Sequence, residues 1–175
     1  MKIFLDSGIT EDIKKVAGLG IIDGATTNPS LIKASGKSIK DVVTEIRKIL
    51  PNGDISVEVV STDVDGMLKE ADEYLNWDKN FTIKIPMTEE GLKTTKKLSS
   101  KGINVNMTLV FTVTQALLAA KAGAKYVSPF VGRIDDISGE GMNLIRELRM
   151  MFDNYGFDTE ILVASVRSVE HVHQA

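Results

Sequence analysis

The chain has 175 residues, of which 43% are hydrophobic and 26% are charged, and its formal net charge is −3. This composition is typical of a globular protein with one core; the acidic balance argues against nonspecific nucleic-acid binding, and no segment has the apolar length of a membrane span. The absence of cysteine excludes disulfides and thiolate catalysis, and we expect a cytoplasmic protein.

Short runs of strand-forming residues alternate along the chain with longer stretches of helical periodicity. Seven strands are predicted, at 2–6, 22–27, 56–60, 82–86, 104–110, 126–131 and 160–165. Between them apolar residues recur at helical spacing, most clearly from Ile39 to Leu50 and from Val64 to Leu75. The predicted helix N-caps are Ser38, Asp63, Thr88, Thr112 and Ser138. Strands joined in this way by single helices describe consecutive βαβ units.

Consecutive βαβ units predict an α/β fold, and we favour a TIM (β/α)8 barrel that lacks its final β8-α8 unit. Seven strands are visible where a closed barrel needs eight, and the chain stops just inside a predicted seventh helix at Val169–Ala175. No linker or change of composition divides the sequence, so residues 1–175 are expected to form one C-terminally incomplete barrel domain. A doubly wound open sheet is the alternative fold.

Every predicted strand carries a polar residue at or near its C-terminal end. Parallel α/β folds keep their chemistry at this edge, and in a barrel these ends converge on one mouth. Each residue alone has an ordinary explanation; Arg133, for example, could simply pair with Asp135 or Asp136. Seven polar ends in otherwise apolar strands are a much less ordinary coincidence, so together they predict a site. These residues are Asp6, Asn28, Glu58, Lys84, Asn106, Thr108, Ser128, Arg133, Ser165 and Arg167.

Lys84 lies between two isoleucines in a strand that ends at Pro86. Burial of a lysine disfavours its ammonium form, and the neutral amine is the nucleophile that forms a Schiff base with a ketone. Asp6 and Glu58 are carboxylates suited to proton transfer. These three residues predict the making and breaking of carbon–carbon bonds next to a carbonyl group.

The remaining strand-end residues predict a phosphorylated sugar as the substrate. The neutral donors and acceptors that suit sugar hydroxyls are Asn28, Asn106, Thr108 and Ser128. Arg133 and Arg167, with Ser165, suit a terminal phosphate, because a guanidinium binds phosphate as a two-pronged fork. We expect no cofactor and no metal, because no dinucleotide or phosphate-loop motif is present and His171 and His173, two apart, are expected to lie in a solvated tail.

Five segments of the sequence resemble the transaldolase family, and the resemblance extends in order over the whole chain. They are Ile3-Phe4-Leu5-Asp6, Asp23-Gly24-Ala25-Thr26-Thr27-Asn28-Pro29-Ser30, Ile83-Lys84-Ile85-Pro86, Asn106-Met107-Thr108-Leu109 and Ser128-Pro129-Phe130-Val131-Gly132-Arg133. The chain is most similar to the short subfamily, which also contains the fructose-6-phosphate aldolases. The resemblance implies transfer of a dihydroxyacetone unit from sedoheptulose 7-phosphate or fructose 6-phosphate to an aldose phosphate, in the non-oxidative pentose phosphate pathway.

The resemblance also implies a role for each residue of the predicted site. It implies that Lys84 forms the Schiff base and that Asp6 is the acid and base of C3–C4 cleavage. Glu58 and Thr108 would hold the catalytic water. The implied substrate ligands are Asn28, Asn106 and Ser128 for the dihydroxyacetone unit, and Arg133, Ser165 and Arg167 for the phosphate. By the same resemblance we expect a homo-oligomer, a pentamer or decamer, with neither nucleic acid nor membrane as a partner.

Two positions separate transaldolases from their aldolase relatives. The aldolases have Gln where Glu58 stands and Tyr where Phe130 stands, and a tyrosine hydroxyl there would help to protonate the enamine. Phe130 offers no proton, so the enamine should persist until an aldehyde acceptor arrives. We therefore expect a transaldolase; the alternatives are a fructose-6-phosphate aldolase and, from another class, an inactive sugar-phosphate-binding remnant.

Overall fold

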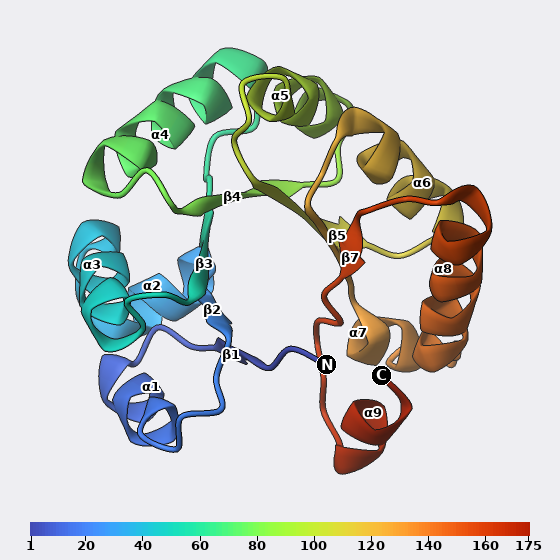
Figure 1. Cartoon of the computed structure of the whole chain (residues 1–175), viewed down its shortest axis with the longest axis horizontal. Helices are drawn as coiled ribbons and strands as arrows, with labels where there is room; N and C mark the ends of the chain where they lie inside the picture. Colours follow the sequence, from blue (N-terminus) through green and yellow to red (C-terminus); the bar gives the residue numbers. More distant parts are fainter. The chain divides into compact units, whose positions relative to one another are not determined.

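The computed structural model describes residues 1–175, which divide into two compact units, Met1–Lys84 and Ile85–Ala175. Figure 1 labels their helices and strands. Strand β4 (Thr82–Pro86) begins in the first unit and ends in the second. The two units are described in turn.

The first unit consists of parallel strands covered by amphipathic helices (Figure 1). Its elements before β4 are β1 (Phe4–Asp6), α1 (Thr10–Ala17), β2 (Gly24–Thr26), α2 (Pro29–Ser35), α3 (Ile39–Ile49), β3 (Asp54–Glu58) and α4 (Val64–Trp77). The predicted apolar stripe of α3 is buried at Val42, Val43 and Ile46, which lie on one helical face. This face packs toward the strands, whereas Lys40, Asp41 and Lys48 of the same helix are exposed.

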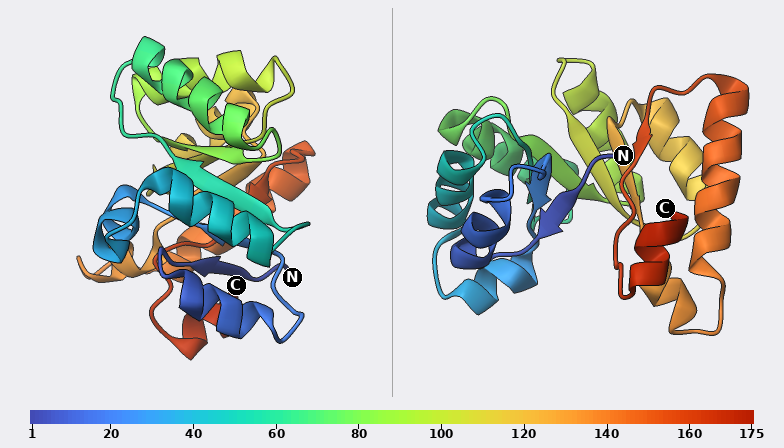
Figure 2. Two further views of the ribbon diagram at one scale, coloured as in Figure 1. Left: turned by 90° about the vertical axis from the view of Figure 1, so that its left-hand side faces the viewer. Right: turned by 60° about the horizontal axis from the view of Figure 1, so that its bottom comes forward.

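The second unit continues the alternation of strand and helix. After β4 its elements are α5 (Glu89–Ser99), β5 (Val105–Val110), α6 (Val113–Ala122), β6 (Tyr126–Pro129), α7 (Val131–Asp135), α8 (Gly141–Tyr155), β7 (Glu160–Ile161) and α9 (Val169–Gln174). Strands β5, β6 and β7 pair in parallel. Val131, Met142 and Ile145 form a buried cluster that joins α7 to α8. Helix α9 lies beside α7 (Figures 1 and 2), where side chains described below connect the two.

All seven predicted strands are present, and several are shorter than predicted. Strand β6 ends at Pro129, because the chain turns into α7 at Val131. Two helices rather than one connect β2 to β3 and β6 to β7. Four predicted N-caps are confirmed, since their side chains accept a hydrogen bond from the first turn: Ser38, Asp63, Thr88 and Thr112. Ser138 was wrong as a cap: it has a left-handed backbone (φ 63°), and α8 begins three residues later.

Strand order confirms the predicted fold class. In each unit, strands that follow one another in sequence pair in parallel, so the order never reverses as it does in a doubly wound sheet. The chain therefore has the α/β architecture of a TIM (β/α)8 barrel, with seven strands, and the doubly wound alternative is wrong. The single domain over residues 1–175 stays a prediction. None of the helices combines the length and apolar character that a membrane crossing requires.

Candidate active site

The amine of Lys84 is buried and contacts two oxygen atoms. Its Nζ lies 2.9 Å from Oε2 of Glu58 and donates a hydrogen bond of 3.0 Å to the carbonyl oxygen of Thr27. The Lys84 side chain is only 7% exposed, and that of Glu58 is 15% exposed. The proton that an ammonium must lose before it can act as a nucleophile therefore has an acceptor in direct contact.

Strand register explains why these groups meet. Glu58 and Lys84 are direct partners across the parallel β3–β4 ladder, so their side chains leave the same face of the sheet. Thr27 follows β2, and its hydroxyl and amide both donate to the carbonyl of Ser56, which fixes the turn that presents the Thr27 carbonyl. The residues that hold the lysine amine thus come from the C-terminal ends of three consecutive strands, β2, β3 and β4.

The sequence predicted an apolar environment for Lys84. The neighbouring residues of the strand are indeed apolar, but the amine itself contacts polar atoms. Ile83 and Ile85 are fully buried on either side. The nitrogen itself is surrounded by a carboxylate and a carbonyl, which satisfies the rule that a buried charge needs a partner. The Lys84 amine is therefore removed from water and at the same time paired with the Glu58 carboxylate.

Asp6 lies at the end of β1, and its carboxylate is held by a neighbour on β2. The hydroxyl of Thr26 donates a hydrogen bond of 2.7 Å to Oδ1 of Asp6. The two residues are register partners across the β1–β2 ladder. Asp6 is exposed to solvent, whereas Thr26 is buried, so a rigid residue fixes the direction of an accessible carboxylate.

Asn28 serves as the N-cap of α2, a use that the sequence analysis did not predict. Its Oδ1 accepts a hydrogen bond of 3.0 Å from the backbone N–H of Leu31, and Pro29 occupies the first helical position. Capping fixes the side chain and engages its oxygen, which leaves the amide nitrogen as the group for a ligand.

In the second unit, Asn106 and Ser128 lie on neighbouring strands and contact each other. The hydroxyl of Ser128 donates a hydrogen bond of 2.8 Å to Oδ1 of Asn106, and both side chains are buried. Asn106 and Thr108 are two residues apart on β5, a spacing that places side chains on one face of a regular strand, but β5 is irregular after Met107. Between Met107 and Val110 the ladder shifts, because two residues of β5 lie opposite one residue of β6.

This bulge places strain next to Thr108. Leu109 has a left-handed backbone (φ 59°), which for a residue with a side chain costs on the order of 1 kcal/mol. Thr108 is buried, and its hydroxyl has no hydrogen-bond partner in the protein. Buried hydroxyls are nearly always paired with protein or with water, so this one is available to a water molecule or a substrate.

The two predicted phosphate-binding arginines differ in their contacts. Arg133, on α7, is exposed and forms no ion pair. Arg167 forms a bidentate ion pair with Asp136, with its Nη1 2.6 Å from Oδ1 and its Nη2 2.9 Å from Oδ2. Pairing of Arg133 with Asp135 or Asp136, the ordinary explanation considered from sequence, is therefore wrong.

Arg167 and Ser165 lie against the chain just before Arg133. A Cβ atom on Gly132 would come within 2.9 Å of Nε of Arg167 and within 2.3 Å of the Ser165 carbonyl oxygen, so only glycine fits there. The N–H of Gly132 donates to that carbonyl, and Ser165 has a left-handed backbone (φ 58°). Two of the three non-glycine residues with positive φ thus adjoin or belong to the predicted site, as strained residues at functional sites often do.

His171 was wrongly expected to lie in a solvated tail. Its side chain is 15% exposed; Nδ1 accepts the backbone N–H of Arg167, and Nε2 lies 3.0 Å from Oδ2 of Asp135. His173 is exposed, as expected. No group of three or more His, Asp or Glu side chains is arranged to hold a metal ion.

Three residues of these clusters had no predicted role: Thr26, Thr27 and Asp136. Thr27 contributes a backbone carbonyl, which leaves no signal in the side-chain pattern. Thr26 could have been found, because it is the position on β2 beside Asp6 once the strands are aligned. Asp136 was noted as a possible ion-pair partner, but of the wrong arginine.

Comparison with known proteins extends to nearly the whole chain. The family model for transaldolase/fructose-6-phosphate aldolase matches residues 3–175. A "Probable transaldolase" of Geotalea uraniireducens is 56% identical over 98% of this chain and 80% of its own length. Proteins with the same name from Lactiplantibacillus plantarum and Aquifex aeolicus are 53% and 57% identical, over 100% and 98% of this chain and 80% and 79% of their own lengths. The chain belongs to the transaldolase/fructose-6-phosphate aldolase family.

Proposed function

We propose that the protein is a transaldolase that transfers a dihydroxyacetone unit between phosphorylated sugars through a Schiff base at Lys84. The observation that carries this proposal is the buried Lys84 amine in contact with the Glu58 carboxylate. Any buried charge needs a partner, but this pair lies at the end of a strand, which is the edge where this fold class keeps its chemistry. The names of the relatives support the same reaction.

The first part of the reaction is formation of the Schiff base. The Lys84 nitrogen attacks the C2 carbonyl of the ketose, and the resulting carbinolamine loses water to give the imine. Glu58, at 2.9 Å, accepts the proton of the amine and can return it to the leaving hydroxyl. The Thr27 carbonyl holds the nitrogen in one direction through its hydrogen bond. The buried hydroxyl of Thr108 is proposed to bind the water that this step releases.

The second part is cleavage and transfer. Asp6 takes the proton of the C4 hydroxyl, the C3–C4 bond breaks, and an aldehyde leaves while the enamine remains on Lys84. The enamine then adds to an aldose phosphate, Asp6 returns its proton to the new hydroxyl, and water releases the product. Asn28, Asn106 and Ser128 are proposed as ligands of the dihydroxyacetone unit, and Arg133, Ser165 and Arg167 as ligands of the phosphate.

Phe130 is proposed to favour transfer of the dihydroxyacetone unit over its release as free dihydroxyacetone. Its ring lies against that of Phe111 in a tilted arrangement, with centroids 5.8 Å apart, and neither ring can donate a proton. Phe130→Tyr is expected to raise release of free dihydroxyacetone relative to transfer by roughly a hundredfold, the lower end of the range for one general acid. The ratio of the two products, measured with and without an aldehyde acceptor, checks this. An unchanged ratio would count against the role of Phe130.

Of the two predicted phosphate-binding arginines, Arg133 is the one without an ion-pair partner, so its removal should weaken phosphate binding directly. A hydrogen bond to a charged group contributes roughly 1.5–3 kcal/mol, so Arg133→Ala is expected to raise KM for phosphorylated ketoses roughly tenfold to a hundredfold. KM for an unphosphorylated ketose should stay nearly unchanged. Steady-state kinetics with both substrates measure this; equal losses for the two would remove the phosphate role.

The proposed function is tested by dependence on an acceptor. Fructose 6-phosphate is incubated with the protein, alone and with erythrose 4-phosphate, and the products are separated. A transaldolase forms sedoheptulose 7-phosphate only with the acceptor and releases little dihydroxyacetone without it. Rapid release of dihydroxyacetone without acceptor would identify the alternative, a fructose-6-phosphate aldolase. Absence of any product would favour the inactive binding remnant.

A further inference from the structure

We propose that Asp136 is a positioning residue for phosphate recognition, because it fixes the guanidinium of Arg167 in the second unit. This inference rests on the proposed function for the identity of the ligand, a phosphate group. The sequence analysis considered Asp136 only as a possible partner of Arg133, so its contact with Arg167 was not expected. The argument starts from the geometry of the ion pair.

Asp136 holds the outer edge of Arg167. Both terminal nitrogens, Nη1 and Nη2, donate to the two oxygens of one carboxylate, at 2.6 Å and 2.9 Å. A guanidinium has five N–H donors, and this contact engages two of them. Nε forms no hydrogen bond in the protein. The side of the guanidinium that carries Nε therefore keeps N–H donors for a second anion. Asp136 can therefore fix the plane of the guanidinium while three of its five N–H donors remain free.

The other end of Arg167 is fixed as well. Its backbone N–H donates to Nδ1 of His171, and Nε2 of the same ring lies 3.0 Å from Asp135. The side chain then passes over Gly132, the residue before Arg133, at a distance that leaves no room for a Cβ atom. Adjacent carboxylates on one short segment thus hold the backbone and the side chain of Arg167, beside the second arginine of the predicted phosphate site.

Stability alone does not account for this arrangement. The side chains of Arg167 and Asp136 are 47% and 41% exposed, and ion pairs this accessible to water contribute little to folding. Prior positioning does matter for binding, because an arginine already held in one direction loses less side-chain freedom when the ligand arrives. Folding stability gains little from this pair, whereas the position of Arg167 beside Gly132 gives the pair a possible effect on ligand binding that an exposed pair elsewhere would lack.

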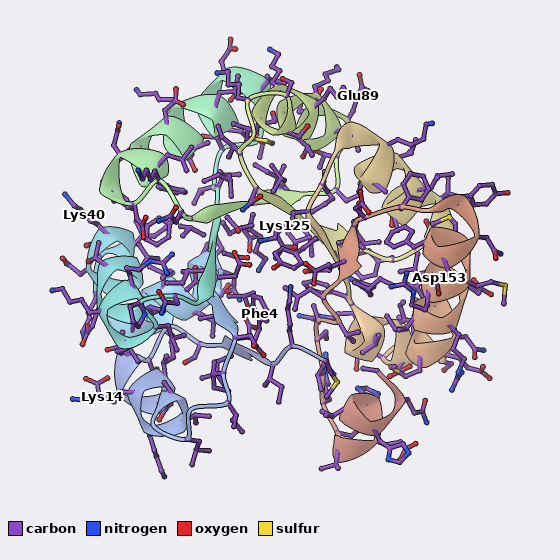
Figure 3. All side chains as sticks on the ribbon, viewed as in Figure 1. Phe4, Lys14, Lys40, Glu89, Lys125 and Asp153 are labelled. Carbon is purple, nitrogen blue, oxygen red and sulfur yellow. The ribbon has the colours of Figure 1, made fainter.

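The matched control is another bidentate pair of the same unit. Arg149 and Asp153 pair one turn apart on α8, where Figure 3 labels Asp153, and both side chains are more than half exposed. Asp153→Asn removes the same charge from a somewhat more exposed pair that holds no predicted site residue. It therefore controls for net charge and for the general loss of a surface ion pair.

The test measures binding of inorganic phosphate to the full chain by isothermal titration calorimetry. Asp136→Asn is expected to weaken binding about fivefold to tenfold, Arg167→Ala at least as much, and Asp153→Asn not at all. Asp136→Glu, which keeps the carboxylate, should recover part of the loss. Unchanged or tighter binding by Asp136→Asn would overturn the inference, because it would mean that Asp136 is neutral or competes with phosphate. Undetectable binding by the unaltered protein would overturn it too.

The same variants separate this inference from the proposed function. Dihydroxyacetone carries no phosphate, so its trapping on Lys84 by borohydride should be equal in the unaltered protein and in Asp136→Asn. Trapping without any effect of Asp136 on phosphate binding rejects the positioning role alone. Failure of trapping with an intact effect on phosphate binding rejects the Schiff base alone. Loss of trapping in Asp136→Asn only would show a broader structural role and would also overturn the inference.

Discussion

Lys84→Met is expected to reduce transfer activity to below about one ten-thousandth of the unaltered value, as removal of a covalent nucleophile does in other enzymes. The reason is that no other amine can take its place: Lys84 is the lysine buried on a strand end, in contact with a carboxylate and a carbonyl. Methionine keeps the length and apolar stem of the side chain. The rate of transfer from fructose 6-phosphate to an aldose phosphate measures the effect.

Stability needs its own control, because the substitution leaves Glu58 without its partner. Loss of one member of a buried ion pair costs about 3 kcal/mol where the remaining charge is partly accessible, and Glu58 is 15% exposed. Adding Glu58→Gln removes the unpaired charge, so the double variant should recover most of the free energy of unfolding and none of the activity. Denaturant titration measures the free energy of unfolding. A double variant that regains activity together with stability would refute the catalytic role of Lys84.

Asp6→Asn is expected to separate Schiff-base formation from carbon–carbon cleavage. An amide cannot accept the C4 hydroxyl proton, so transfer should slow by roughly 10²- to 10⁴-fold, the usual contribution of one general base. The hydrogen bond from Thr26 can persist to the amide oxygen, which keeps the geometry of the strand end. Borohydride should still trap fructose 6-phosphate on Lys84 at a rate close to that of the unaltered protein.

Thr26→Val provides a graded comparison for this variant. It removes the hydroxyl that directs Asp6 and keeps the shape of a buried side chain, so transfer should fall less than with Asp6→Asn. Equal transfer rates in Asp6→Asn and the unaltered protein would assign the proton transfer to another group. Loss of trapping in Asp6→Asn would instead place Asp6 in formation of the Schiff base.

The strands, and with them the ends that carry polar residues, could be predicted because local pattern determines them. Lys84 was identifiable from its position between isoleucines and before a proline, and alignment of β3 with β4 brings Glu58 beside it. The contact itself could not be measured from sequence, because it depends on register. The carbonyl of Thr27 was not predictable at all, since any residue can present a carbonyl and only the path of the turn after β2 directs it.

The second unit shows a different limit. Ion-pair partners depend on the path of the short helix α7 and not on distance along the chain: Asp136 pairs with Arg167, 31 residues away, although Arg133 is three residues away. The strained bulge at Leu109 had no signal either, because leucine has no preference for a left-handed backbone. Ser138 failed as a cap for a related reason, since its segment turns through a left-handed residue before α8 begins.

The most direct measurement of the central claim is the mass of the intact protein after borohydride reduction with dihydroxyacetone, followed by peptide mapping. The account predicts one added, reduced dihydroxyacetone unit per chain, located on Lys84, and no addition to Lys84→Met. An adduct on any other lysine, or an equal addition to the unaltered protein and to Lys84→Met, would contradict it.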